Sequence, residues 1–115
     1  MSPRLEVVSA GVGTTFQDLG RPGWAHVGVP ASGAVDRSAM TAVNRAVGNP
    51  PDAVVLETAG GLTLEAVDRS IIASTRSIAP SVLRHGRRFE VPADTDRQWH
   101  YVAVQGGFAV ETTLG

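Results

Sequence analysis

The stretch "DRSAMTAVNRAVGNPP", residues 36 to 51, decides the fold, because it carries the one convincing helical pattern in the 115-residue chain. Its apolar residues recur at spacings of three and four, which predicts a helix with one buried face. That face is made of Ala39, Met40, Val43, Ala46 and Val47. Asp36 is a suitable N-cap, since its carboxylate can accept from the free N–H groups of the first turn. Gly48, Asn49 and two prolines then end the helix.

Outside this helix the sequence is typical of short strands separated by glycines. The expected strands cover residues 4–9, 53–58, 62–67, 70–75 and 99–105. "VLRHGRRFEV" (82–91) predicts a hairpin that turns near His85-Gly86. Within 101–105, Tyr101, Ala103 and Gln105 alternate with two valines, which predicts a strand with one buried face before a turn at Gly106-Gly107. We expect a single domain over residues 1–115, mostly β with one helix.

Composition excludes several classes of function. The chain has no cysteine, so it has no disulfide framework and no thiolate metal site. Its net charge is −1, and the only basic cluster is "RHGRR" at 84–88, so we expect no nucleic-acid partner. The histidines at 26, 85 and 100 lack the spacing of metal ligands. No apolar run approaches the roughly 18 residues of a membrane helix. The N-terminus has no signal-peptide core, and we expect a soluble, cytoplasmic protein.

The stretch "TTFQDLGRPGWAHVGVPASGAVD", residues 14 to 36, is rich in glycine and proline and poor in continuous apolar sequence. Asp18 and Arg21 are close enough to pair with each other or to bind opposite ends of a polar ligand, since arginine grips carbonyl and carboxylate oxygens at two points. Ser32, Gly33 and Asp36 precede the helix, whose free N–H groups favour anionic or carbonyl oxygens. Alternatively, Asp18 and Arg21 only staple the loop and Asp36 only caps the helix. The residues alone leave both interpretations open.

Two more polar residues are candidates for ligand contact. Asn44 lies at the border of the expected apolar helix face, where an asparagine usually hydrogen-bonds a neighbouring loop. Glu57 lies in the apolar "VVLETAGG". It either points to solvent from an alternating strand, which the pattern slightly favours, or is buried with a compensating cation such as Arg21 or Arg45.

These residues resemble the N-terminal part of the biotin-dependent carboxyltransferase family. That family includes allophanate hydrolase subunit 2, one of the subunits of 5-oxoprolinase, the larger partner of a bacterial sporulation-kinase inhibitor and the carboxyltransferase part of urea amidolyase. Its pattern is roughly T-T-x-Q-D-x-G-R, then G-V-P-x-S-G-x-x-D, then A-x-x-x-A-N-x-x-V-G-N, then L-E. The matching positions are Thr14-Thr15, Gln17-Asp18, Gly20-Arg21, Gly28-Val29-Pro30, Ser32-Gly33, Asp36, Asn44, Val47-Gly48-Asn49 and Leu56-Glu57. One small departure is Val43, where the family tends to have alanine.

The resemblance implies a cyclophilin-like β-barrel unit and a companion from the subunit 1 family. It implies a small amide or lactam substrate such as urea, allophanate or 5-oxoproline. The expected substrate-binding residues are Asp18, Arg21, Ser32, Gly33, Asp36, Asn44 and Glu57, while no residue is assigned a catalytic role. The chain carries no biotin-attachment lysine motif, so the biotin carrier would be a separate protein. We expect this chain to bind no cofactor itself, with ATP or carboxybiotin bound elsewhere in the complex.

Three functions follow as alternatives. The first is a subunit of a complex that hydrolyses a small amide or lactam. The second is a carboxyltransferase that passes carboxyl from carboxybiotin to urea, and the third is a regulatory module that binds without catalysis. Family members usually run to more than twice this length, and Arg76 stands where the family favours a small residue. We therefore expect little catalysis by this chain alone, and expect Phe108 to Gly115 to pack on another polypeptide or on a further part of the chain.

Overall fold

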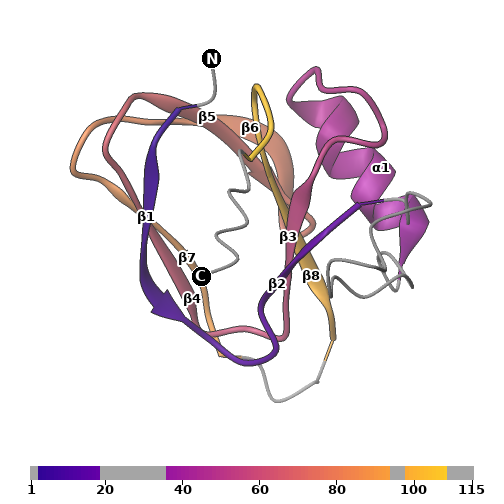
Figure 1. The fold of residues 1–115 in the computed structure, drawn as a ribbon, viewed down its shortest axis with the longest axis horizontal. Helices are drawn as coiled ribbons and strands as arrows, with labels where there is room; N and C mark the ends of the chain where they lie inside the picture. Colours follow the sequence, from indigo (N-terminus) through magenta and orange to yellow (C-terminus); the bar gives the residue numbers. More distant parts are fainter. Residues whose placement is uncertain (1–2, 19–35, 94–97, 109–115) are drawn as a thin grey trace, which may run out of the picture.

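The computed structural model describes residues 3–18, 36–93 and 98–108, and these contain eight strands and one helix (Figure 1). In chain order the elements are β1 (Leu5–Ala10), β2 (Thr15–Gln17), α1 (Arg37–Ala46), β3 (Val55–Thr58), β4 (Leu62–Ala66), β5 (Ser70–Ser74), β6 (Ser77–Leu83), β7 (Arg88–Val91) and β8 (His100–Val104). The predicted class, mostly β with one helix, is confirmed.

The strands form two antiparallel sheets. One has three strands in the order β1-β4-β7, and the other has five in the order β2-β3-β8-β5-β6. In Figure 1 the small sheet lies on one side of the molecule, and α1 covers the opposite face of the large sheet. Among the described residues the strands do not close into one hydrogen-bonded ring. The expected barrel unit is therefore present as two facing sheets around a shared core.

Two apolar clusters hold these layers together. The first joins α1 to the large sheet and contains Met40, Val43, Val47, Val55, Ala73, Tyr101 and Ala103. The second lies between the sheets and contains Leu56, Leu62, Leu64, Ala66, Ile72, Leu83, Val91 and Val102. Because β3 and β8 lie between the clusters, every residue of both strands is buried. The prediction of one buried face for 101–105 is wrong for this reason: Tyr101 and Ala103 face α1, while Val102 faces the other sheet.

The helix forms where the apolar spacing predicts it. Met40 and Val43 are fully buried and Val47 is 2% exposed, whereas Ala39 and Ala46 are partly buried against the same cluster. The Asp36 Oδ1 accepts from the Ala39 N–H at 3.0 Å, which confirms the predicted N-cap. At the other end Gly48 has φ of 77° and its N–H donates to the Arg45 carbonyl, which ends the helix as expected.

The predicted hairpin in 82–91 is wrong. The chain does turn near His85-Gly86, where the Arg87 N–H donates to the Arg84 carbonyl. However, β6 pairs with β5 in the large sheet and β7 pairs with β4 in the small one. The turn contacts the end of β4, where the Gly86 N–H donates to the Ala66 carbonyl at 2.8 Å. That contact directs the chain from one sheet to the other, so this turn is a crossover.

A second crossover brings glycines into close contact. The links β1–β2 and β3–β4 both pass between the sheets and run side by side, with the Val12 N–H donating to the Gly60 carbonyl. Gly11 has φ of 71°, and a Cβ there would lie 2.4 Å from the Gly60 oxygen. Only glycine fits this approach without a backbone shift. The result fixes β2 beside β3, which positions the start of the glycine-rich stretch.

Candidate functional site

Both ends of the stretch 14–36 meet at Glu57. At its start, β2 pairs with β3 so that Thr15 lies directly opposite Glu57, and the Thr14 hydroxyl hydrogen-bonds that of Thr58 at 2.7 Å. At its end, the Asp36 N–H donates to the Tyr101 hydroxyl at 2.8 Å. That same hydroxyl donates to the Glu57 Oε2 at 2.5 Å. One end of the stretch thus pairs with the strand that carries Glu57, and the other end reaches the Glu57 carboxylate through Tyr101.

Glu57 is buried, with 4% of its surface exposed. The slightly favoured expectation of a solvent-facing carboxylate is therefore wrong, because β3 is an interior strand with both faces covered. Arg45, one of the expected compensating cations, is on the exposed side of α1. The hydrogen bond from Tyr101 contributes to the compensation, since donation to a carboxylate stabilises its charged form. Arg21, the other expected cation, lies outside the described residues.

Tyr101 is the residue that the sequence reasoning missed. It lies opposite Glu57 in the β3–β8 pairing and is fully buried. Burial, reinforced by the hydrogen bond to Glu57, raises the pKa of the Tyr101 phenol well above its usual value of 10.0. A signal was available in the sequence: a tyrosine inside an apolar strand needs a partner for its hydroxyl, and a polar residue on a neighbouring strand can supply one.

Asp36 takes part in two hydrogen bonds that hold the start of α1. Its carboxylate caps α1 through Ala39, and its own N–H is taken by Tyr101. The geometry therefore brings the Asp36 N–H and the Glu57 carboxylate into contact with one hydroxyl group. Asp36 is exposed, so it lies at the outer end of this chain of contacts while Glu57 lies at the inner end.

Asn44 is fully buried, and not at the border of the helix face as expected. Its Nδ2 donates to the carbonyls of Pro51 at 3.3 Å and Ala53 at 2.9 Å, which confirms the expected contact with a neighbouring loop. Its Oδ1 is buried without a hydrogen-bond partner among the described residues. Asn44 thereby holds the turn that leads into β3, the strand that carries Glu57.

Asp18 is half-buried and directly follows Gln17, which pairs with Val55 of β3. Asp18 therefore directly follows β2, the strand that pairs with the strand of Glu57. The other expected site residues, Arg21, Ser32 and Gly33, lie outside the described residues. So do the proposed contacts between Asp18 and Arg21.

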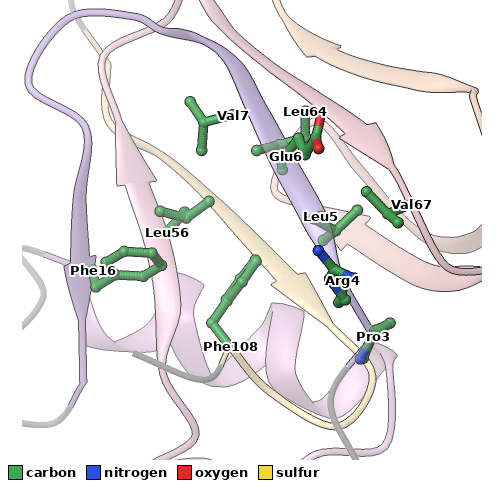
Figure 2. A pocket seen from close by; sticks show the side chains of 10 residues that line it. All are labelled: Pro3, Arg4, Leu5, Glu6, Val7, Phe16, Leu56, Leu64, Val67 and Phe108. Carbon is green, nitrogen blue, oxygen red and sulfur yellow. The ribbon is translucent and has the colours of Figure 1, made fainter. Parts of the chain in front are cut away.

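A separate hollow of about 280 Å³ opens on the other side of β3, between the two sheets (Figure 2). Figure 2 shows Phe16, Leu56 and Phe108 on one wall and residues of β1 on the other. The rings of Phe16 and Phe108 lie 5.8 Å apart. Phe108 thus packs against its own chain, contrary to the expectation for that residue, while 109–115 lie outside the described residues. Leu56 and Glu57 are neighbours on opposite faces of β3, so this hollow, which Arg4 and Glu6 also line, is distinct from the site around Glu57.

The described ranges 3–18, 36–93 and 98–108 contain no candidate metal site and no candidate membrane-spanning helix. No three histidine or carboxylate side chains gather there as a metal site would require. None of the helical structure in those ranges is long and apolar enough to cross a bilayer.

Comparison with known proteins places this geometry in a family. The model of the carboxyltransferase domain, subdomains A and B, matches residues 27–115, which include α1, Glu57 and Tyr101. The chain is 31% identical to a 5-oxoprolinase subunit of Escherichia coli K12 over 96% of its own length and 40% of that protein. It is 34% identical to urea amidolyase of Lachancea kluyveri over 96% of its length and 7% of that protein.

The solved structures agree with the sequence matches. The K. lactis urea amidolyase superimposes with a TM-score of 0.78 at 28% identity, over the whole of this chain and 8% of that one. This chain therefore spans less than half the length of the curated relatives it matches. It belongs to the carboxyltransferase-domain family, as the residues around Asp18 to Glu57 indicated.

Proposed function

We propose that this chain supplies part of the substrate site in a complex that hydrolyses a small amide or lactam of the allophanate or 5-oxoproline type. One observation carries the proposal: the buried carboxylate of Glu57 lies where both ends of the glycine-rich stretch 14–36 converge. The 31% identity to a 5-oxoprolinase subunit over nearly the whole chain supports this class of substrate.

The residues around Glu57 suit a neutral, planar ligand with one carbonyl and adjacent N–H groups. In this proposal the carboxylates of Asp18 and Glu57 accept from the ligand N–H groups, and Arg21 donates to its carbonyl oxygen. Ser32, Gly33 and Asp36 approach with backbone or hydroxyl groups from the helix side. Asn44 acts indirectly, by holding the turn before β3.

The proposal includes a partner from the subunit 1 family, with both chains in the cytoplasm. Two edge strands of this chain expose apolar side chains: Val7 and Val8 on β1, and Ile78 and Val82 on β6. Exposed strand edges of this kind are common places for another polypeptide to pack. ATP, which such hydrolysis can consume, would bind elsewhere in the complex.

Carboxyl transfer to urea is the second candidate. It is supported by the family model, which describes a carboxyltransferase domain, and by the identity to urea amidolyase. In that reaction carboxybiotin on a separate carrier protein would supply the carboxyl group. The acceptor nitrogen must lose a proton as its new C–N bond forms, and Glu57 or Asp18 would accept that proton.

The two candidates are separated by assays on the chain co-purified with a subunit 1 homologue. Hydrolysis of 5-oxoproline or allophanate supports the first. Incorporation of labelled bicarbonate into urea, with a biotin carboxylase and its carrier added, supports the second. Glu57→Gln should lower either activity at least tenfold, because it removes the negative charge of the acceptor oxygen at the site. The exposed Glu90 of β7 provides a matched control in Glu90→Gln. Equal turnover by both variants, or no turnover of any substrate, overturns the proposal.

A further inference from the structure

The Tyr101 hydroxyl forms hydrogen bonds with groups from two different elements. It donates to the Glu57 Oε2 on β3 at 2.5 Å and accepts from the Asp36 N–H at the start of α1 at 2.8 Å. One oxygen atom therefore joins the buried carboxylate to the N-terminus of the helix. The first contact lies at the short end of the range for O–H···O hydrogen bonds.

Core packing and backbone hydrogen bonds fix the position of the Tyr101 ring. Tyr101 is fully buried in the cluster with Met40 and Val43. Its backbone is fixed on the other side by Thr75, whose hydroxyl accepts from the Tyr101 N–H and whose N–H donates to the Tyr101 carbonyl. Since packing fixes the ring, the position of the hydroxyl is also fixed. The hydroxyl therefore determines where the Glu57 carboxylate and the Asp36 N–H lie.

We propose that Tyr101 is a positioning residue, whose hydroxyl sets the place of the Glu57 carboxylate relative to the N-terminus of α1. Glu57 itself contacts the ligand in the proposed function, and Tyr101 acts through it. The inference rests on that proposed function only for its effect on turnover. The link between Glu57, Tyr101 and Asp36 stands as a property of the chain alone.

The direction of the hydrogen bonds gives the link a physical meaning. The Asp36 N–H polarises the phenol oxygen, which strengthens donation from the phenol to Glu57. A change in the charge of Glu57 should therefore be felt at the Asp36 amide, through the hydroxyl. Phenylalanine at position 101 would keep the ring packing and remove this transmission, because it lacks only the oxygen.

The composition allows the first test to report on Tyr101 alone. The chain has one tyrosine, no cysteine and no lysine, so Tyr101 is the one side chain expected to titrate between about pH 9 and 12. Phenolate absorbance at about 295 nm should stay low in the folded chain above about pH 11. In Glu57→Gln the midpoint should move toward 10 by about one pH unit, because the nearby negative charge is gone. The control Ser70→Ala removes a buried hydroxyl at the far end of β5 and should leave the midpoint unchanged.

The second test is a double-mutant cycle read at the Asp36 amide by NMR. Glu57→Gln should shift the Asp36 N–H resonance in the parent chain and should leave it almost unchanged in the Tyr101→Phe background. Equal shifts in both backgrounds would show that the hydroxyl is not the link. If Tyr101→Phe does not fold, the phenolate titration still decides, because it uses chains that retain the tyrosine. An unchanged midpoint in Glu57→Gln would then overturn the inference.

The third test is turnover in the complex with the subunit 1 homologue. Tyr101→Phe should lower kcat about tenfold or more with little change in KM, since a misplaced group affects the transition state more than ground-state binding. Ser70→Ala should keep the parent kcat. A parent complex without any turnover refutes the proposed function but leaves the titration and the amide cycle to decide the link. An active parent with equal kcat for both variants refutes positioning.

Discussion

Two similar pairs of apolar residues differ strongly in their exposure to solvent. Val7-Val8 in β1 are 54% and 46% exposed, whereas Val55-Leu56 in β3 are 0% and 3% exposed. Adjacent residues on a regular strand point to opposite faces, as Val55 and Leu56 do, whereas the pairing of β1 with β4 shifts register between Val7 and Ser9. The exposure of each pair also depends on what covers its strand.

The position of each strand in its sheet explains the contrast. β3 lies between β2 and β8, with α1 on one face and the small sheet on the other. β1 is the edge strand of the small sheet, and β4 is its one neighbour among the described strands. A run of β-branched and apolar residues thus predicts a strand but does not predict its burial. Burial of a carboxylate such as Glu57 requires a central strand with both faces covered.

The largest expected effect comes from placing a charge in each region. Val102→Asp puts a carboxylate on β8, at a fully buried position between the sheets. It should prevent folding, because the described residues of the surrounding cluster are apolar and cannot compensate the charge. Val8→Asp, on the half-exposed edge strand, should change the free energy of unfolding by less than about 1 kcal/mol. Circular dichroism and urea unfolding check both. A folded Val102→Asp with a near-parent melting temperature would break the comparison.

Truncation of side chains should give the next largest contrast. Leu56→Ala should destabilise the chain by about 2–5 kcal/mol, because it removes a buried side chain and enlarges the hollow between the sheets. Val7→Ala, on the facing wall of the same hollow, should cost less than about 1 kcal/mol because its side chain is already half in solvent. Similar losses for the two variants in urea unfolding would mean that β1 is covered in solution.

Alkaline pH tests the interior polar site. Since the pKa of Tyr101 is raised in the folded chain, the unfolded phenol loses its proton first, near pH 10. The unfolded state then binds fewer protons than the native state, so stability should begin to fall near pH 10, with a slope that approaches about 1.4 kcal/mol per pH unit at higher pH. Below about pH 9 this contribution should not vary. Urea unfolding at about pH 9, 10 and 11 measures the slope, and Tyr101→Phe should lack it. The same slope in that variant would assign it to another cause.

The smallest expected effect concerns the cap of α1. Asp36→Ala should cost about 0.5–2 kcal/mol, because the Ala39 N–H loses its acceptor. Asp36→Asn should cost less, since asparagine is also a good N-cap and keeps the backbone N–H that binds Tyr101. Thermal unfolding of the two variants measures the difference. An equal loss in both would show that the charge of Asp36, rather than its role as hydrogen-bond acceptor, stabilises the helix.

Local patterns accounted for much of the fold. The helix, its N-cap at Asp36 and its end at Gly48 follow from spacing and from residues with strong local preferences. β2 and residues 77–81 of β6 were not expected to be strand, but five other strand segments were found close to their observed bounds. The pairing of β6 and β7 was not, because a short glycine turn looks the same in sequence whether the chain folds back or crosses to another sheet.

The candidate site shows the same division. The sequence by itself determined that Asp18, Asp36, Asn44 and Glu57 belong to a family motif, and that Asp36 caps a helix. Only the tertiary structure decided that Glu57 is buried, that Asn44 supports the turn before β3, and that Tyr101 joins Glu57 to Asp36. The physical reason is separation along the chain. Glu57 and Tyr101 are 44 positions apart, and their contact exists because two strands pair in one register, which no local preference specifies.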